Sequence, residues 1–227
     1  MTVRDRALKA LARQLGHPRG LFGRLVARRL NRGNRDMVAE AVDASGAGAG
    51  QVVADLGFGG GVGLGLLLEA TSPNGQVHGL DISDEMIAGA RRHYRGMVRS
   101  GRLVLHRVSG SSLPLPDSSL DALITVNTFY FVAELAPLLD EVARVLRPDA
   151  RLVVGVGDPV RMAEMPVTRH GFRLRPIDAI VAELEAVGML AVEHRRIGTG
   201  DDEAHMLVAQ RPLHKPNQAF DSGLPSS

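Results

Sequence analysis

The spacing of apolar residues divides the chain into a helical beginning and a longer part made of short alternating elements. In the first 45 residues leucines recur every three or four positions, which is typical of amphipathic helices. The pattern breaks at 17–20, where proline and glycine interrupt it, and a further helix is expected at about 34–42. The leucines that carry this pattern are Leu8, Leu11, Leu15, Leu21, Leu25 and Leu30.

From residue 51 onwards short apolar runs alternate with helical segments. Strands are expected at 51–55, 76–81, 102–107, 120–126, 151–156, 189–197 and 204–211, and helices at 61–70, 83–97, 133–146 and 176–187. The run 120–126 is apolar on both faces, as a buried parallel strand is. This order predicts an α/β fold: a doubly wound, mostly parallel seven-stranded sheet with an antiparallel C-terminal edge strand and an N-terminal helical segment.

Changes in composition indicate three segments. The small residues of 45–50 form a hinge between an N-terminal helical segment, 1–48, and the α/β domain, 49–211. Residues 212–227 are rich in proline and polar residues and are expected to form a disordered tail.

Composition and charge exclude several classes of site. The chain contains no cysteine, which excludes disulfides, thiolate nucleophiles and cysteine-bound metal centres. No apolar run approaches the ~18 residues of a membrane span, and no secretory signal is visible, so a cytoplasmic location is expected. The net charge is only +2, but basic residues dominate positions 1–35, where Asp5 is the single acid. Such a stretch is either a solvated helical face or a surface for nucleic acid or a phosphorylated substrate.

The residues just after each predicted strand are the main candidates for ligand binding, because open parallel sheets bind ligands at that edge. After the first strand, residues 55–63 read Asp-Leu-Gly-Phe-Gly-Gly-Gly-Val-Gly. No frame of this loop completes the G-x-G-x-x-G pattern of a dinucleotide site. The loop fits D-x-G-x-G-x-G instead, in which Asp55 can meet a cationic group and would repel a pyrophosphate. The alternative is a glycine-rich turn without a ligand.

A second acidic residue, Asp81, stands at the end of the next predicted strand. At this position an acidic side chain accepts hydrogen bonds from ribose hydroxyls. An isolated aspartate before a helix is more often only favourable to the helix dipole. The combination of Asp81 with the glycine loop therefore indicates a ligand that contains a nucleoside.

Four motifs in this order resemble those of the class I S-adenosylmethionine-dependent methyltransferases. Residues 53–61 are similar to the first motif of that family, and 79–83 with Met86 to the second. Residues 113–121 resemble its L-P-F-x-D-x-S-F-D stretch, and 141–148 its E-x-x-R-V-L-K-P signature. The resemblance implies a Rossmann-like fold, S-adenosylmethionine as cofactor, S-adenosylhomocysteine as product, and methyl transfer to a small-molecule acceptor by in-line displacement.

The resemblance also implies a role for each matching residue. Asp55 would face the amino group of the methionine portion, and Asp81 would hold the ribose hydroxyls. The other cofactor contacts implied are Gly57, Phe58, Gly59, Gly61, Ile82, Met86, Ser109, Gly110 and Asn127. Ser109 departs from the family, which often carries an aspartate there that bonds the adenine amino group. A serine can still donate or accept one hydrogen bond, and Ser111 or Ser112 could contribute instead.

Aromatic residues are scarce, yet Phe58, Phe129, Tyr130 and Phe131 fall in loops at the expected ligand edge. They predict either an apolar pocket for substrate and adenine or ordinary packing at the sheet edge. Tyr130 is the first candidate for a hydrogen-bond partner or catalytic base, and His170, after the fifth strand, is the second. The other histidines show no metal-ligand spacing, so no metal is expected.

The N-terminal segment is expected to fold over the cofactor cleft as a lid, as it does in relatives of that family. Phe22 would be an apolar contact of this lid, and Arg19 could meet an acidic acceptor. The alternative is a helix that packs on the sheet without touching substrate.

Other functions stay open at this point. The basic N-terminus could serve an RNA methyltransferase, but 127–130 reads Asn-Thr-Phe-Tyr rather than the N-P-P-[YF] or D-P-P-Y of nucleic-acid amino methyltransferases. Nucleic acid is therefore not the expected partner. A non-catalytic S-adenosylmethionine-binding protein is a further alternative, whereas the broken dinucleotide pattern disfavours an NAD-dependent dehydrogenase. The sequence leaves the oligomeric state open, with a homodimer as one option.

Overall fold

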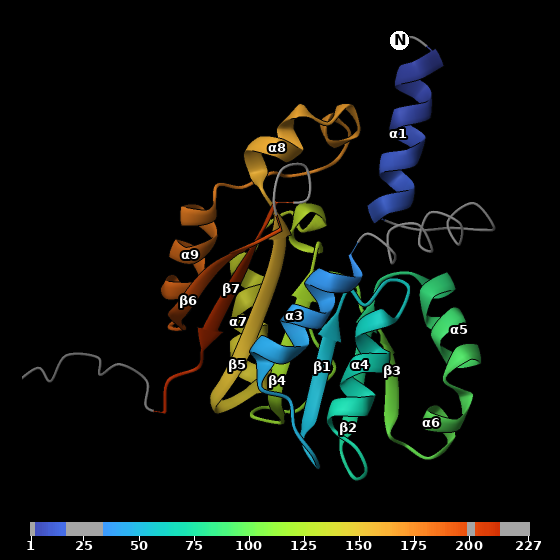
Figure 1. Ribbon diagram of the computed structural model, residues 1–227, viewed down its shortest axis with the longest axis vertical. Coiled ribbons are helices and arrows are strands. Elements are labelled where there is room, and N and C mark those ends of the chain that lie inside the picture. Colours follow the sequence, from blue (N-terminus) through green and yellow to red (C-terminus); the bar gives the residue numbers. More distant parts are fainter. Residues whose placement is uncertain (1–2, 17–33, 199–202, 214–227) are drawn as a thin grey trace, which may run out of the picture.

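The computed structural model describes residues 3–16, 34–198 and 203–213 (Figure 1). Several expectations from the sequence lie outside these ranges. They are the helical pattern at 21–30, the lid residues Arg19 and Phe22, and all but the first two residues of the tail at 212–227.

Seven strands form one sheet in the order β3-β2-β1-β4-β5-β7-β6 (Figure 1). Their bounds are β1 Val52–Leu56, β2 Gln76–Asp81, β3 Leu103–Arg107, β4 Leu120–Val126, β5 Leu146–Gly157, β6 Leu190–Ile197 and β7 Ala204–Gln210. The strands from β3 to β5 pair in parallel, whereas β7 runs antiparallel to both β5 and β6. The predicted α/β fold class, with a mostly parallel sheet and antiparallel pairing at its C-terminal end, is confirmed. The last strand lies one position inside the edge, between β5 and β6.

Helices cover both faces of the sheet and enclose two hydrophobic cores. One core lies under α3, α4 and α5, and the other lies under α7 and α9. The helices are α1 Val3–Gly16, α3 Arg35–Ser45, α4 Val62–Ala70, α5 Asp84–His93, α6 Arg95–Arg99, α7 Ala136–Val145, α8 Pro159–Glu164 and α9 Ile177–Ala186, with the 3-10 turns η1 Phe129–Phe131 and η2 Pro166–Arg169. Alternation along the strands explains the two cores, since Val53 points into one and Ala54 into the other.

The strand order fixes where a ligand can bind. β1 and β4 are neighbours, but the chain leaves β1 towards β2 and leaves β4 towards β5 on the opposite side. Connections that diverge in this way open a crevice at the carboxyl ends of the two strands. β4 is buried except at Asp121 and Val126, which are partly exposed, and so confirms the expected central strand.

The helix expected at 83–97 is divided in two at Tyr94, which lies between α5 and α6 with φ −101° and ψ 30°. Its hydroxyl donates to the carbonyl oxygen of Gly61 at 2.9 Å. This long-range bond fixes the side chain against the glycine loop, which explains a break that the helical pattern does not reveal. The expected N-cap at Ser83 is confirmed, because its side chain accepts a hydrogen bond from the backbone N–H of Met86.

The short elements between β5 and α9 are absent from the sequence-based prediction. α8 begins at Pro159 and is capped by Asp158, which accepts from the N–H of Arg161 at 2.8 Å. A six-residue helix is too short for apolar periodicity to identify it.

Replacing Gly89 by alanine is expected to stabilise the protein by about 0.5–1 kcal/mol, because glycine inside a helix costs about that amount. A Cβ at Gly89 would meet nothing within 4 Å. Gly101→Ala is the matched control, since its surroundings are equally open but its φ is +75°. Urea unfolding should show a gain for the first variant and a loss for the second; equal shifts would contradict the argument.

Candidate functional site

A cavity of about 540 Å³ opens at the carboxyl ends of β1, β2 and β4. Its walls come from the loops after β1, β2, β3 and β4, from α3 and from the first turn of α7. Its volume is that of a typical small-molecule site. The cavity therefore lies at the edge of the sheet where the sequence predicts a ligand.

Gly57 lets the loop after β1 approach the loop after β4. Its φ of +75° lies in the left-handed region, and its N–H donates to the carbonyl oxygen of Leu80 at 2.7 Å. A Cβ at this position would lie 2.2 Å from Oγ1 of Thr128, closer than any real contact. Only glycine fits here, and at Gly57 the cavity is consequently lined by backbone.

Asp81 connects the loops after β1 and β2. One carboxylate oxygen accepts from the N–H of Gly59 at 2.9 Å, and the other accepts from the N–H of Ser83 at 2.8 Å. The residue is only 6% exposed and lines the cavity. Asp81 thus shapes the glycine loop and also presents its carboxylate to whatever the cavity holds.

Asp55 is the buried acid at the end of β1, with 5% of its surface exposed, and it also lines the cavity. Helix α4 passes so close that a Cβ at Gly63 would lie 2.2 Å from Oδ2 of Asp55. Among the described residues, no hydrogen bond reaches this carboxylate. Burial, and secondarily the Asp81 carboxylate, raise the pKa of Asp55 to about 8. A cation in the cavity would favour the ionised form.

The loops after β2 and β3 form the side wall. Ile82, Met86 and Gly110 line the cavity, in agreement with their expected places. Ser109 does not line it and is exposed, whereas Ser111 does line it. The alternative donor that the sequence leaves open, Ser111, therefore reaches the cavity where Ser109 does not.

The end of β4 supplies the opposite wall. Asn127 lines the cavity as expected and adopts a positive φ of 57°, a conformation that asparagine tolerates better than most residues. Its N–H donates to the carbonyl oxygen of Gly155 at 2.8 Å, which fixes the backbone after the strand. Thr128 lines the cavity beside it.

The four aromatic residues of the expected pocket divide into two pairs. Phe58 and Phe131 line the cavity. Phe129 and Tyr130 do not line it, and both are buried in the core under α7 and α9. Residues 129–131 form a tight 3-10 turn, so neighbouring side chains point in different directions.

The two candidate bases lie away from the cavity. The Tyr130 hydroxyl accepts a hydrogen bond from the N–H of Gly157. The pKa of Tyr130 is raised above its usual value, mainly because the side chain is buried. His170 follows η2 and does not line the cavity either. In this structure Tyr130 holds the end of β5, and neither residue is placed to take a proton from a ligand in the cavity.

Several residues of the site carry no signal in the sequence. Asn34, the N-cap of α3, and Val38 of the helix line the cavity, as do Val132 and Glu134 of the segment after β4. The helix at 34–42 is predicted, but which of its sides meets the cavity depends on tertiary packing. Gly61 does not line the cavity; its carbonyl is instead bound by Tyr94.

The ionisable groups of the cavity are few. Of the described residues that line it, Asp55, Asp81 and Glu134 are ionisable, and all three are acids. The described part of the chain contains no cluster of three or more His, Asp or Glu side chains that could hold a metal ion. In the same ranges no helix has both the length and the apolar character that crossing a bilayer requires.

This arrangement fits one kind of ligand better than others. A buried acid with no hydrogen-bond partner among the described residues, Asp55, suits an ammonium group. The second buried acid, Asp81, suits vicinal hydroxyls, and the apolar side wall suits a flat ring. A pyrophosphate would meet two carboxylates and no cation among the described lining residues. The residues present therefore fit a nucleoside with a cationic tail.

Part of the chain is similar to known sequences. Residues 54–154 match a family described as "Methyltransferase domain". A 37.1 kDa protein in transposon TN4556 of Streptomyces fradiae is 40% identical over 56% of this chain and 35% of its own length. An O-methyltransferase of Pyrenophora dematioidea is 30% identical over 46% of this chain and 39% of its own length. The chain thus spans less than half the length of these curated relatives.

Comparison with solved structures concerns the fold. A SAM-dependent methyltransferase from Aquifex aeolicus superimposes with a TM-score of 0.66, over 82% of this chain and 97% of that protein. The superposition shows that the two proteins share a fold. Because their sequences are only 20% identical, the likeness concerns the fold alone.

Proposed function

We propose that this chain, a member of the class I S-adenosylmethionine-dependent methyltransferases, transfers a methyl group to a small-molecule acceptor by in-line displacement. The single observation that carries the proposal is the buried Asp55 carboxylate, which faces the cavity without a hydrogen-bond partner among the described residues. Beside it stands Asp81, already ordered by two backbone N–H groups.

The chain's own residues would hold the cofactor as follows. Asp55 would bind the ammonium group of the methionine portion, with the Gly57 backbone beneath it. Asp81 would accept hydrogen bonds from the ribose hydroxyls, and Ile82 and Met86 would pack against the adenine. When bound, S-adenosylmethionine supplies an electrophilic methyl group on a sulfonium leaving group. Ser111, which lines the cavity, is our candidate for contact with the adenine edge.

The acceptor would enter from the side of Phe131, Val132 and α3. These side chains are largely apolar, so they can exclude water and align an acceptor without charging it. Glu134 is the ionisable residue of this side among the described lining residues, and it is exposed. The site therefore suits an acceptor that brings its own nucleophilic lone pair or loses its proton to solvent.

The cavity favours a small molecule over RNA. Its described walls carry acids rather than arginines, and acids repel a phosphate backbone. The basic segment that motivates the RNA alternative lies mostly outside the described residues. A cytoplasmic location belongs to the same proposal.

Calorimetry tests the cofactor directly. The protein is titrated with S-adenosylmethionine, S-adenosylhomocysteine and NAD in separate experiments. We expect the two sulfur ligands to bind and NAD not to bind. Binding of NAD alone would overturn the proposal, and tight binding without turnover on a broad panel of acceptors would favour a non-catalytic binding protein.

The raised pKa of Asp55 predicts that binding of S-adenosylhomocysteine depends on pH. Below pH 8 the free carboxyl is mostly protonated, so binding an ammonium group beside it must release a proton. We expect affinity to rise by up to about tenfold per pH unit from pH 6 to pH 8. Proton release is measured as a dependence of the binding enthalpy on the buffer. Asp55→Asn should bind more weakly and without this dependence.

The same shift has a consequence for stability without ligand. Because the pKa of Asp55 is higher in the folded protein than its usual 3.8, its contribution to folding is present below about pH 4 and is lost as pH rises through 8. Asp55→Asn should remove this decline. An unchanged pH dependence in both experiments would contradict the assignment.

A further inference from the structure

The wall beside the expected adenine site is an irregular loop rather than a strand or helix. Gly110, Ser111 and Leu113 of this loop line the cavity. Leu113 is 3% exposed, and residues 108–119 carry no regular hydrogen-bond ladder between β3 and β4. Its position must therefore be set by contacts from elsewhere in the fold.

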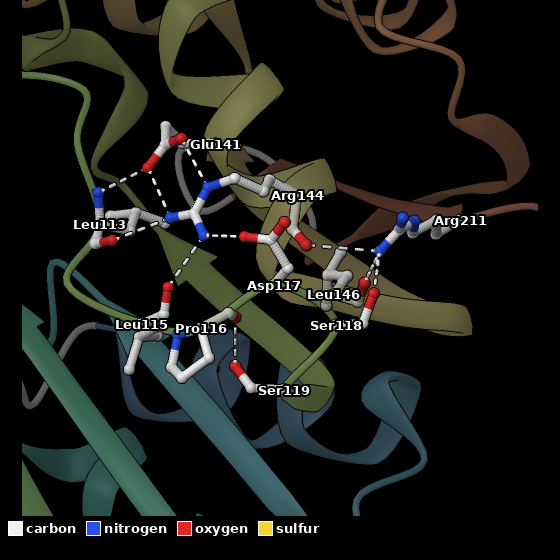
Figure 2. Close-up of polar contacts among 10 residues, drawn as sticks. All are labelled: Leu113, Leu115, Pro116, Asp117, Ser118, Ser119, Glu141, Arg144, Leu146 and Arg211. Atoms are coloured by element: carbon white, nitrogen blue, oxygen red, sulfur yellow. Dashed lines mark hydrogen bonds and ion pairs between the residues drawn. The ribbon is translucent and has the colours of Figure 1, made fainter.

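Two side chains of α7 bind the two polar backbone groups of Leu113 (Figure 2). Glu141 accepts the N–H of Leu113 at 2.9 Å, and Arg144 donates to the carbonyl oxygen of Leu113 at 3.0 Å. Glu141 and Arg144 are joined by two parallel hydrogen bonds of 2.7 and 2.8 Å. The N–H and the carbonyl oxygen of Leu113, which lines the cavity, are therefore both hydrogen-bonded to the Glu141–Arg144 ion pair.

Arg144 also binds residues further along the same loop. Its second terminal nitrogen donates to the carbonyl oxygen of Leu115 at 2.9 Å and to Asp117 at 2.6 Å. The planar guanidinium presents its donors in a fixed fork, so these acceptors are held at defined positions relative to one another. A lysine could not make the same set of bonds.

The ion pair keeps its charges over a wide pH range. The hydrogen bond from Arg144, followed by that from Leu113, lowers the pKa of Glu141 to about 2. The same carboxylate raises the pKa of Arg144 above its usual range. Both side chains are partly exposed, so their main effect is directional rather than a large gain in stability.

Helix α7 also forms part of the cavity itself. Pro137 and Leu138 line it one turn before Glu141. One helix therefore carries a section of the wall and, a turn later, the pair that holds the facing loop. The distance between Leu113 and α7 follows from this pair.

We infer that Glu141 and Arg144 are positioning residues that set the adenine-side wall of the cavity by fixing the Leu113 peptide, an inference that rests on the proposed cofactor. Neither of them lines the cavity. Without the hydrogen bonds from the Arg144 guanidinium, Leu113 and Ser111 move away from the adenine ring and cofactor affinity falls. Binding of the ammonium group at Asp55 is unaffected.

Arg211 provides a matched control in the same view (Figure 2). It also donates to backbone and side-chain oxygens, those of Leu146, Arg144 and Ser118. None of the three lines the cavity. The substitutions Arg144→Lys and Arg211→Lys thus remove comparable hydrogen-bond networks, but only the network of Arg144 holds a residue that lines the cavity.

The test compares these two variants with the wild type by calorimetry with S-adenosylhomocysteine, alongside urea unfolding and hydrogen exchange of the Leu113 amide without ligand. We expect Arg144→Lys to weaken binding about tenfold or more and to speed exchange at Leu113. Arg211→Lys should stay within about twofold of wild type in both. Proton release on binding, which reports on Asp55, should be unchanged in either variant.

Glu141→Gln serves as a second variant, because its amide oxygen can still accept the N–H of Leu113 and its effect should be intermediate. It replaces Arg144→Lys if that variant does not fold. Equal losses of affinity in the Arg144 and Arg211 variants, or unchanged Leu113 exchange in Arg144→Lys, would overturn the inference. If wild type binds no S-adenosylhomocysteine, the proposed function fails, and the exchange of Leu113 still decides whether the pair positions this loop.

Discussion

Asp81→Ala is expected to weaken binding of S-adenosylhomocysteine by at least about 100-fold. The carboxylate accepts the N–H groups of Gly59 and Ser83, and under the proposed function it also holds the ribose. Each hydrogen bond to a charged group contributes roughly 1.5–3 kcal/mol, and about 1.4 kcal/mol corresponds to a tenfold change in affinity. The substitution removes the ligand contact and frees the glycine loop at the same time, which is why we expect a large loss.

Two variants separate these effects. Asp81→Asn keeps one acceptor oxygen, so its loss of affinity should be smaller than that of the alanine variant. Asp84→Ala is the control, because Asp84 is an acid three positions away whose side chain is 75% exposed and pairs with Arg107. Calorimetry should find the control close to wild type. An unchanged affinity in Asp81→Ala would remove the proposed role of this residue.

Gly57→Ala is expected to destabilise the fold by about 2–5 kcal/mol and to abolish cofactor binding. A left-handed backbone costs an L-residue roughly 1–2 kcal/mol, and an overpacked contact costs roughly 1–3 kcal/mol more. The added Cβ would lie 2.2 Å from Oγ1 and 2.8 Å from Cγ2 of Thr128, so the two loops must separate. Urea unfolding measures the loss of stability.

The contribution of the clash can be isolated. Gly59→Ala has a φ of +50° but nothing closer than 3.9 Å, so it should lose only the backbone term. Adding Thr128→Ala to Gly57→Ala removes the two closest atoms and should recover part of the stability. If Gly57→Ala and Gly59→Ala were equally destabilised, steric contact between the two loops would not matter.

Local patterns were sufficient for the order of the seven strands and the longer helices, and for the loops that line the cavity. The apolar run of β4, the glycine loop and Asp81 can each be recognised from a few neighbouring residues of the sequence. Their places at the ends of β1 and β2 follow from the parallel topology, because parallel strands present their carboxyl ends at one edge. The cavity is where this reasoning puts it.

The direction of individual side chains could not be derived in this way. Phe131 lines the cavity while Phe129 and Tyr130 enter the core, a difference set by one 3-10 turn. Ser111 lines the cavity and Ser109 does not, because the loop after β3 is held by contacts from another helix. Such contacts join residues far apart in sequence, so no local pattern contains them.

The signature at 141–148 shows the same limit in another form. Its resemblance to a family motif could be read directly from the sequence. Leu113 lies 28 and 31 residues from Glu141 and Arg144, so the bond from its N–H to Glu141 and the bond that its carbonyl accepts from Arg144 appear only when the chain is folded. A motif of this kind records a structural requirement without stating what it is.

The position of β7 between β5 and β6 has a consequence for how the protein is made. β7 is the strand to which both β5 and β6 are hydrogen-bonded, yet it is synthesised after both of them. While a nascent chain still has Ala204–Gln210 inside the ribosome, β5 is an open edge and β6 lacks the strand that anchors it. The five strands from β3 to β5 in the sheet order can assemble early, but β7 and β6 can join the sheet only after translation has passed residue 210.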